Sequence, residues 1–263
     1  MVEEDIFRYM KEFGAFDYEK ALDAFLRRQK QNPKAYRGPD KDHRIFPNYY
    51  APVLFKGEKK MGLEMMRYSA YPRQGFPEGL AKDLTTFNAR RESLKNKFWE
   101  HAFGVHHGII LLTGFTEWVS VKNVVDAGLM SLQNIQSRFM AAAAERKKKV
   151  EATGKKVVPT QIELTHPLQR KMELDFLPKP ADTLFVAVLF SPNKDDTEHG
   201  FAIITDEPEA DIAAAGHDRM PVTLTVPAAK KWLAPQGKSV DELLAILSEK
   251  VHDHFRVDLP MAA

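Results

Sequence analysis

The spacing of apolar residues along this chain predicts helices at both ends and mostly strands between them. From residue 3 to residue 28, apolar side chains recur every three or four positions, which is typical of amphipathic helices. Gly14 interrupts this pattern, so we expect two helices there. Short runs of β-prone residues follow. The turn residues that begin at Gly57 predict a hairpin between a strand at 53–55 and a return strand at 63–71.

The remaining elements follow from the same criteria. The predicted strands are 108–117, 184–190, 201–205 and 220–224. The predicted helices are 92–101, 227–232 and 239–251. Ser239 and Glu242 have the spacing of a capping box, which favours a helix N-terminus at that point.

Residues 119–167 depart from the strand pattern. Val125–Met140 is amphipathic, and Ala141–Lys149 extends it with strong helix formers until Gly154 ends the helix. A long helix with a basic tip between two strands predicts an insertion in a β-rich domain. We therefore expect an α+β fold, with a single domain over residues 1–263 built round antiparallel strands, peripheral helices and a helical insertion at about 119–167.

Composition narrows the class of protein. The chain is 44% hydrophobic and 28% charged, which suits a folded protein and argues against wholesale disorder. The acidic segment Met1–Ile6 does not resemble a secretory signal, and no apolar run approaches the roughly 20 residues that span a bilayer. We expect a soluble protein that is not secreted and has no membrane partner. It would be cytoplasmic and nucleoid-associated, or nuclear in a eukaryote.

Charge and cysteine content limit the chemistry. The formal net charge of +2 neither requires nor excludes a nucleic-acid partner. The absence of cysteine excludes disulfides, thiolate nucleophiles and cysteine-ligated zinc. The neighbouring His106 and His107 lack an HExxH pattern, so we expect no metal and no other cofactor.

The first of three polar motifs suits an oxygen-rich ligand. Asn88 and Arg90 are two residues apart, so on a strand their side chains face the same side. The amide would orient a sugar oxygen while the guanidinium binds a phosphate. The alternative is a polar strand end that caps a turn.

The other two motifs supply groups that transfer protons. Glu117 ends an apolar run beside Trp118, and a desolvated carboxylate favours acid–base chemistry. His217 lies in a loop fixed by Pro221, and histidine is the side chain best suited to proton transfer near neutral pH. The alternatives are a surface carboxylate and a solvent-exposed loop histidine.

In this order the motifs resemble the SOS response-associated peptidase (SRAP) family. Asn88–Glu92 matches the family's Asn-Ala-Arg-x-Glu, Gly114–Trp118 matches Gly-x-x-Glu-Trp, and His217–Pro221 matches His-x-Arg-Met-Pro. The resemblance covers roughly residues 46–118 and 170–233. The motifs before Asn88 depart from the family, because Tyr49 replaces an asparagine and Met66-Arg67-Tyr68 replaces a Trp-Gly.

The resemblance implies covalent chemistry on abasic sites in single-stranded DNA. Family members use a cysteine after the initiator methionine, whose amine and thiol form a thiazolidine with the abasic aldehyde. If the family's residue roles apply to this chain, Asn88 holds the sugar, and Glu117 and His217 move protons in the same pocket. Position 2 is Val2, so the family crosslink and autoprocessing are not expected. The α-amine of Val2 remains a competent Schiff-base nucleophile, with a reference pKa of about 7.7–8.0.

Two hypotheses therefore compete. The first is a DNA-repair protein of the SOS response that recognises abasic or otherwise damaged DNA, with Schiff-base lyase activity through the N-terminal amine. The second is a non-catalytic relative that binds or shields single-stranded or modified DNA, or a protein partner. Either would use basic and aromatic residues near a DNA-binding groove, which the resemblance implies, to contact DNA. These are Arg67, Arg90, Arg91, Trp118 and Arg219.

The basic tip of the insertion is a further candidate contact. Lys147, Lys148 and Lys149 would add a DNA contact or bind a protein partner. The alternative is a solvated helix end.

Overall fold

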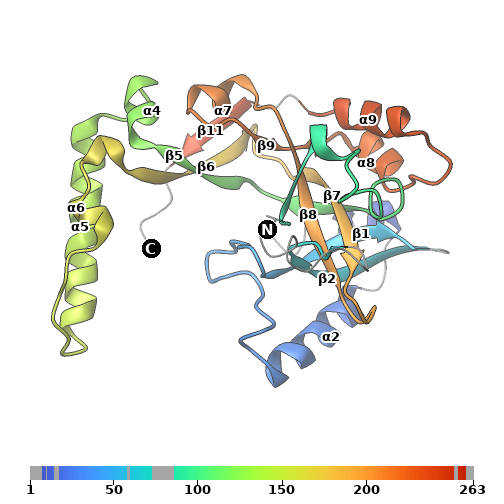
Figure 1. Ribbon diagram of the computed structural model, residues 1–263, viewed down its shortest axis with the longest axis horizontal. Helices are drawn as coiled ribbons and strands as arrows, with labels where there is room; N and C mark the ends of the chain where they lie inside the picture. The colour runs from blue at the N-terminus through green and yellow to red at the C-terminus, as the bar shows by residue number, and fades with distance from the viewer. Residues whose placement is uncertain are drawn as a thin grey trace. The chain divides into compact units, whose positions relative to one another are not determined.

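The computed structural model confirms an α+β fold, with its helices and strands divided between two compact units (Figure 1). It describes residues 8–9, 11–14, 18–57, 60–72, 86–251 and 254–258. The first unit comprises 1–113, 183–206 and 221–252, and the second comprises 114–182, 207–220 and 253–263. A single domain with an insertion at 119–167 stays a prediction.

The first unit is built on a sheet that closes on itself. Its strands are β1 (Tyr50–Lys56), β2 (Met61–Tyr68), β3 (Asn88–Arg90), β4 (His107–Leu112), β7 (Leu184–Pro192), β8 (His199–Asp206) and β10 (Thr223–Leu224). β9 (Met220–Pro221) lies where the chain passes from the second unit into the first. The order β7-β4-β1-β2-β8 is completed by a direct pairing of β7 with β8, so these strands form a closed ring.

Hydrophobic runs in the sequence account for these strands. The predicted hairpin is confirmed, since β1 and β2 are antiparallel and the Gly57 N–H donates to the carbonyl of Lys60 at 2.9 Å. The strands predicted at 184–190 and 201–205 are confirmed as β7 and β8. Eight of the nine residues of β7 are buried, which explains why its segment Leu184–Phe190 is continuously apolar rather than alternating.

Helices pack on the core of this unit. They are α2 (Tyr18–Gln31), the short 3-10 helix η1 (Arg91–Ser93), α8 (Val226–Trp232) and α9 (Val240–Ser248). The predicted capping box at Ser239 and Glu242 is confirmed. Trp232 is fully buried and its indole N–H donates to the carbonyl of Gly108 at 3.1 Å, so the α8 side chain with the largest apolar area also has its polar group satisfied.

Two predictions in the first half of the chain are wrong. No α-helix forms over 92–101. Instead η1 is followed by turns that bury Leu94 and Trp99 at a spacing that a regular helix would not give. The single strand expected at 108–117 is two strands in different sheets, because the strand is interrupted at Gly114. A Cβ on Gly114 would lie 2.7 Å from the backbone oxygen of Phe176, so this close approach requires glycine.

The second unit combines an antiparallel sheet with short helices and one long helix. Its strands are β5 (Phe115–Ser120), β6 (Lys171–Lys179) and β11 (His254–Asp258), paired in the order β11-β6-β5. Its helices are α4 (Val121–Asp126), α5 (Leu132–Glu151), α6 (Gln161–Leu164), the 3-10 helix η2 (Pro167–Gln169) and α7 (Ala210–Ala214).

The helix predicted over Val125–Met140 is two helices rather than one. α4 ends at Asp126, and the chain turns through Gly128, whose φ is 69°. α5 then begins after Ser131, whose hydroxyl accepts from the backbone N–H of Asn134 at 3.2 Å. The extension of this helix through Lys149 is confirmed.

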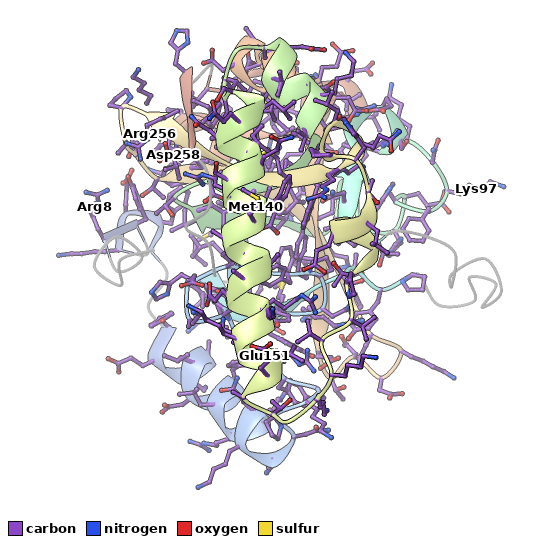
Figure 2. The ribbon with its side chains drawn as sticks, turned by 90° about the vertical axis from the view of Figure 1, so that its left-hand side faces the viewer. Arg8, Lys97, Met140, Glu151, Arg256 and Asp258 are labelled. Atoms are coloured by element: carbon purple, nitrogen blue, oxygen red, sulfur yellow. The ribbon has the colours of Figure 1, made fainter. Side chains whose placement is uncertain are left out.

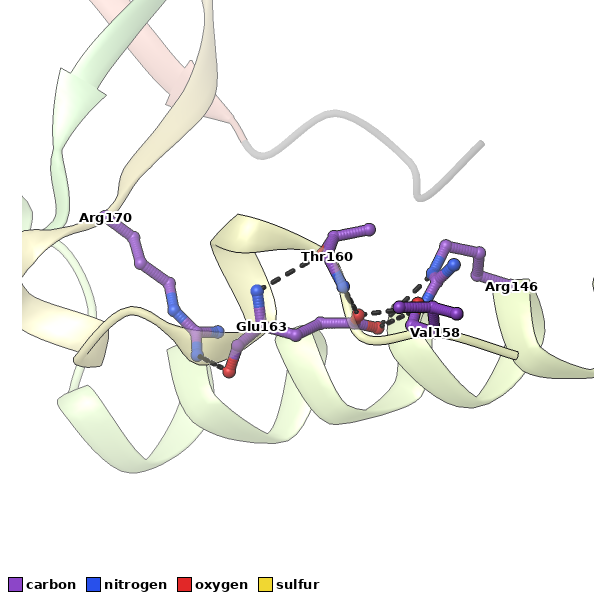
Figure 3. A network of polar contacts seen from close by, with 5 residues as sticks. All are labelled: Arg146, Val158, Thr160, Glu163 and Arg170. Carbon is purple, nitrogen blue, oxygen red and sulfur yellow. Dashed lines mark hydrogen bonds and ion pairs between the residues drawn. The ribbon is translucent and has the colours of Figure 1, made fainter. Parts of the chain in front are cut away.

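α5, α6 and the segment between them form a hairpin, here called the helical arm (residues 132–164). α5 is mostly solvent-exposed, and Figure 2 shows it with Met140 and Glu151 along its length. The guanidinium of Arg146 forms an ion pair with Glu163 at 2.8 Å and also donates to the carbonyl of Val158 at 3.0 Å (Figure 3). Polar contacts, rather than a buried core, hold the return segment against α5. No helix in the described part of the chain is long and apolar enough to cross a membrane.

Replacing Arg146 should release the return segment of the arm. Arg146→Ala removes the ion pair to Glu163, and we expect trypsin to cleave at Lys155 and Lys156 roughly two- to fivefold faster, as loss of a surface ion pair implies. Arg138→Ala is the control, because it removes an exposed arginine from the same helix. Equal cleavage rates in the two variants would show that the ion pair does not hold the arm closed.

Candidate functional site

Strand β5 presents Glu117 on the apolar face of the three-stranded sheet. Glu117 lies opposite Leu174 of β6, and its strand neighbours on the same face are Phe115 and Val119. Leu174 and Val119 are both buried, while 27% of the Glu117 side chain is exposed. The carboxylate therefore abuts apolar groups and remains within reach of solvent, and its acid–base role stays a prediction.

His217 meets this carboxylate from the loop that follows α7. Its Nε2 lies 3.1 Å from Oε2 of Glu117. Its Nδ1 lies 2.8 Å from the carbonyl oxygen of Arg219, which can only accept, so Nδ1 carries a proton and donates it there. The backbone N–H of Arg219 is farther from Nδ1, at 3.4 Å, and is the weaker contact. Nε2 is left to exchange its proton with Glu117 or with a ligand.

The pairing changes the acid–base behaviour of the imidazole. The hydrogen bond to Glu117 raises the pKa of His217, burial opposes this, and the carbonyl of Arg219 adds to the rise. Because the pKa of His217 is raised in the folded state, the charged pair contributes its full stabilisation of the fold at pH values below about 6.5, the pKa of histidine in the unfolded chain. That stabilisation is lost as the pH rises through the folded pKa.

A glycine and an asparagine fix the histidine loop. Gly216 has a φ of 85°, and a Cβ there would lie 2.2 Å from Nδ2 and 2.5 Å from Cβ of Asn123. The Asn123 side chain extends from α4 and donates to the carbonyl of Gly216 at 3.3 Å. α4 follows β5 directly, so one continuous segment carries Glu117 and also holds the loop of His217. Sequence reasoning missed Asn123, because no motif marks it.

The neighbours of this pair occupy different positions. Trp118 is 54% exposed, and the alternation of side chains along β5 places it on the opposite face from Glu117. Arg219 is half-buried, and its backbone carbonyl orients His217. Their DNA contacts stay predictions.

In the first unit, β3 carries the amide and guanidinium of the first motif. β3 runs parallel to β8, with Asn88 opposite Ile203, and the intervening Ala89 is fully buried. Oδ1 of Asn88 accepts from the hydroxyl of Tyr68 at 3.1 Å, which orients the amide. Arg90 is exposed and has no partner among the described residues.

Two other predicted DNA contacts have partners within the protein. Arg91 forms an ion pair with Asp206 at 2.8 Å and donates to the carbonyl of Leu244 at 2.9 Å, so it joins η1 to α9. The guanidinium of Arg67 donates to Asn48 and lies 5.4 Å from the centre of the Tyr71 ring. A DNA contact of Arg91 would compete with its ion pair.

Other parts of the predicted site stay predictions. Val2 lies outside the described residues. Asn88 belongs to the first unit, whereas Glu117 and His217 belong to the second, so a pocket shared by all three stays a prediction. Within the described ranges, no group of three or more histidine, aspartate or glutamate side chains is arranged to hold a metal ion.

Comparisons with known proteins identify the family. Solved structures with a similar fold include a protein from Bacteroides thetaiotaomicron, at 17% identity over 90% of this chain and 88% of that chain, with a TM-score of 0.52. A phage-related protein from Bordetella bronchiseptica is also 17% identical, over 82% of this chain and 81% of that chain, with a TM-score of 0.51. No curated protein matches the sequence. The profile of the family described as SOS response associated peptidase (SRAP) matches residues 8–258, so the chain belongs to the SRAP family.

Proposed function

We propose that this protein binds single-stranded DNA, recognises abasic sites, and forms a Schiff base with their aldehyde through its N-terminal amine. Family membership suggests a DNA-damage-associated, DNA-binding function, and the proposal adds the substrate and the reaction. The observation that carries it is the pairing of Glu117 with His217 at 3.1 Å. A carboxylate and an imidazole in contact can move a proton in either direction near neutral pH.

The reaction needs proton transfer at two steps. In the first, an amine attacks the C1′ aldehyde of the opened sugar, a carbon–nitrogen bond forms, and water leaves to give the imine. In the second, a base removes a C2′ proton, the bond from C3′ to oxygen breaks, and the phosphate leaves with the electron pair. His217 in its charged form supplies the proton that water needs on leaving, and the Glu117 carboxylate or neutral His217 accepts the C2′ proton.

The nucleophile of this reaction is the α-amine of Val2. The chain has no cysteine, so a thiazolidine cannot form. Removal of Met1 would expose the α-amine of Val2, whose reference pKa of about 7.7–8.0 leaves part of it unprotonated near neutral pH. The adduct would then be a reversible imine that permits strand cleavage, rather than a permanent crosslink.

A second candidate function is binding without covalent chemistry. The lack of cysteine favours it, because the group that completes the family reaction is missing. In that case the exposed Arg90 and the oriented amide of Asn88 would bind DNA. The two functions share the DNA strand and differ in whether an adduct can be trapped.

Removing Arg90 should weaken DNA binding in a salt-dependent way. Arg90 is exposed, so its loss leaves no buried group unpaired. For Arg90→Ala we expect the slope of log affinity against log salt to fall by about 0.7, the value for one phosphate contact on a single strand. Fluorescence anisotropy with a labelled oligothymidine at several salt concentrations measures it, and Arg27→Ala on the exposed surface of α2 is the control. A slope equal to that of the control would exclude a phosphate contact at Arg90.

A further inference from the structure

The helical arm has a net positive charge, whereas the rest of the chain is slightly negative. Residues 138–163 contain seven basic and three acidic residues, a net charge of +4. The whole chain has a net charge of +2, so the remaining residues together carry −2. A local excess of this kind attracts polyanions, even when the total charge does not.

The cations at the tip of the arm differ in their partners. Lys147 forms an ion pair with Glu151 at 3.9 Å, and Lys149 forms one with Glu145 at 2.7 Å, so these charges are partly balanced within α5. Three further exposed lysines have no carboxylate partner among the described residues. These are Lys148, Lys155 and Lys156.

Polar contacts hold the return segment of the arm against α5. Near the tip, Arg146 forms an ion pair with the carboxylate of Glu163 (Figure 3). The hydrogen bond from the backbone N–H of Thr160 lowers the pKa of the Glu163 carboxyl, and the hydrogen bond from Arg146 lowers it further. Near the base, Arg170 donates to the carbonyls of Glu163 and Thr165 at 3.1 and 2.8 Å, and its guanidinium lies 4.8 Å from the centre of the Phe139 ring. Lysines at a helix C-terminus can also merely complement the helix dipole. That role requires no bracing of the return segment, whereas a binding surface benefits from it.

We infer that the tip of the helical arm is a second DNA-binding surface, which contacts the phosphate backbone of the strand through Lys148, Lys155 and Lys156. This rests on the proposed DNA-binding function and adds a surface to it. A backbone contact fits lysine side chains, which act as point charges and need no fixed orientation of the ligand. Protein interfaces, in contrast, are depleted in lysine. The arm also carries exposed apolar side chains. Met140 lies about 12 Å along α5 from Lys148, whereas Val158 follows Lys156 by two residues and borders the charged tip.

The test compares two variants with the same change in net charge. The arm variant is Lys148→Gln, Lys155→Gln and Lys156→Gln, and the control is Lys20→Gln, Lys30→Gln and Lys34→Gln, all exposed residues at or just after α2. Anisotropy with a labelled 30-nucleotide oligothymidine is measured between 50 and 200 mM salt. We expect the arm variant to bind on the order of tenfold more weakly at 50 mM and its salt slope to fall by about 2, as the loss of three single-strand phosphate contacts implies. The control should stay close to wild type, and circular dichroism checks that both variants fold.

The outcomes separate this inference from the proposed function. If the arm variant binds no more weakly than the control while Arg90→Ala reduces the salt slope, the arm does not bind DNA and the proposed function stands. A basic arm of that kind would suit an acidic protein partner. If the wild-type protein binds no DNA, both the proposed function and the inference are overturned. Replacing the same three lysines by arginine should retain binding, because the charge is kept.

Discussion

Glu117→Gln is expected to slow aldehyde chemistry on abasic DNA by about an order of magnitude or more, because the variant loses the carboxylate that pairs with His217 and is proposed to transfer protons. The same substitution removes the main cause of the raised pKa of His217, so that pKa should fall towards its ordinary value. An NMR titration of the imidazole measures the second effect, and the pH dependence of adduct formation measures the first. Both effects in one variant would link the electrostatic pairing to the chemistry.

The chain offers a matched control for this experiment. Glu64 and His199 form another carboxylate–imidazole pair, with Nδ1 of His199 3.0 Å from Oε2 of Glu64. Burial lowers the pKa of His199, but the hydrogen bond and charge of Glu64 outweigh it and the net shift is upward. Glu64→Gln should therefore lower the pKa of His199 and leave the aldehyde chemistry unchanged.

His217→Ala should slow the reaction about as much as Glu117→Gln. The double variant should be little slower than either single variant, because residues that act as a unit are not additive. Unchanged rates in both single variants would remove the pair from the mechanism.

Gly216→Ala is expected to destabilise the protein and to reduce the same chemistry. The new methyl group would meet the Asn123 side chain at 2.2–2.6 Å and would require a φ of 85° from an L residue. We expect a cost of about 1–2 kcal/mol from the backbone and a further 1–3 kcal/mol from the overlap. Thermal and denaturant unfolding measure the stability, and the trapping assay measures the activity.

Gly128→Ala separates the two causes. Gly128 also has a positive φ, 69°, but a Cβ there would meet nothing within 4 Å. This variant should show the backbone cost alone and keep full activity. If the two variants were equally destabilised and equally active, Asn123 would not be what holds the histidine loop in place.

The sequence predicted the fold well wherever one local signal was enough. The hairpin turn at Gly57 and the capping box at Ser239 each depend on residues a few positions apart, and both are confirmed. The strand break at Gly114 was missed because apolar residues continue on both sides of it. Only the close approach of Phe176, some sixty residues later in the chain, requires the glycine. The break at Gly128 was missed for a different reason, since amphipathic periodicity persists across it.

In the candidate site, too, the residues with a local sequence signal were predicted and those set by distant contacts were not. The motifs identified Glu117 and His217 one by one, and the family resemblance predicted that they share a pocket. In the structure Nε2 of His217 lies 3.1 Å from Oε2 of Glu117. The sequence did not identify Asn123, whose role depends on contact with a glycine about ninety residues away. It also treated Arg91 as a ligand contact, although the structure gives it an ion pair with Asp206 that no local pattern reveals. Sequence motifs predict which side chains belong to the candidate site. The residues that position these side chains depend on tertiary contacts, which no motif reveals.

Borohydride trapping with a single-stranded oligonucleotide that contains one abasic site, followed by mass spectrometry of the adduct, tests the proposed chemistry directly. We expect an adduct on the α-amine of Val2 that is strongly reduced in Glu117→Gln. A protein that binds the same oligonucleotide measurably but gives no trapped adduct would contradict the Schiff-base chemistry. The candidate site would then be one that recognises DNA without reacting with it.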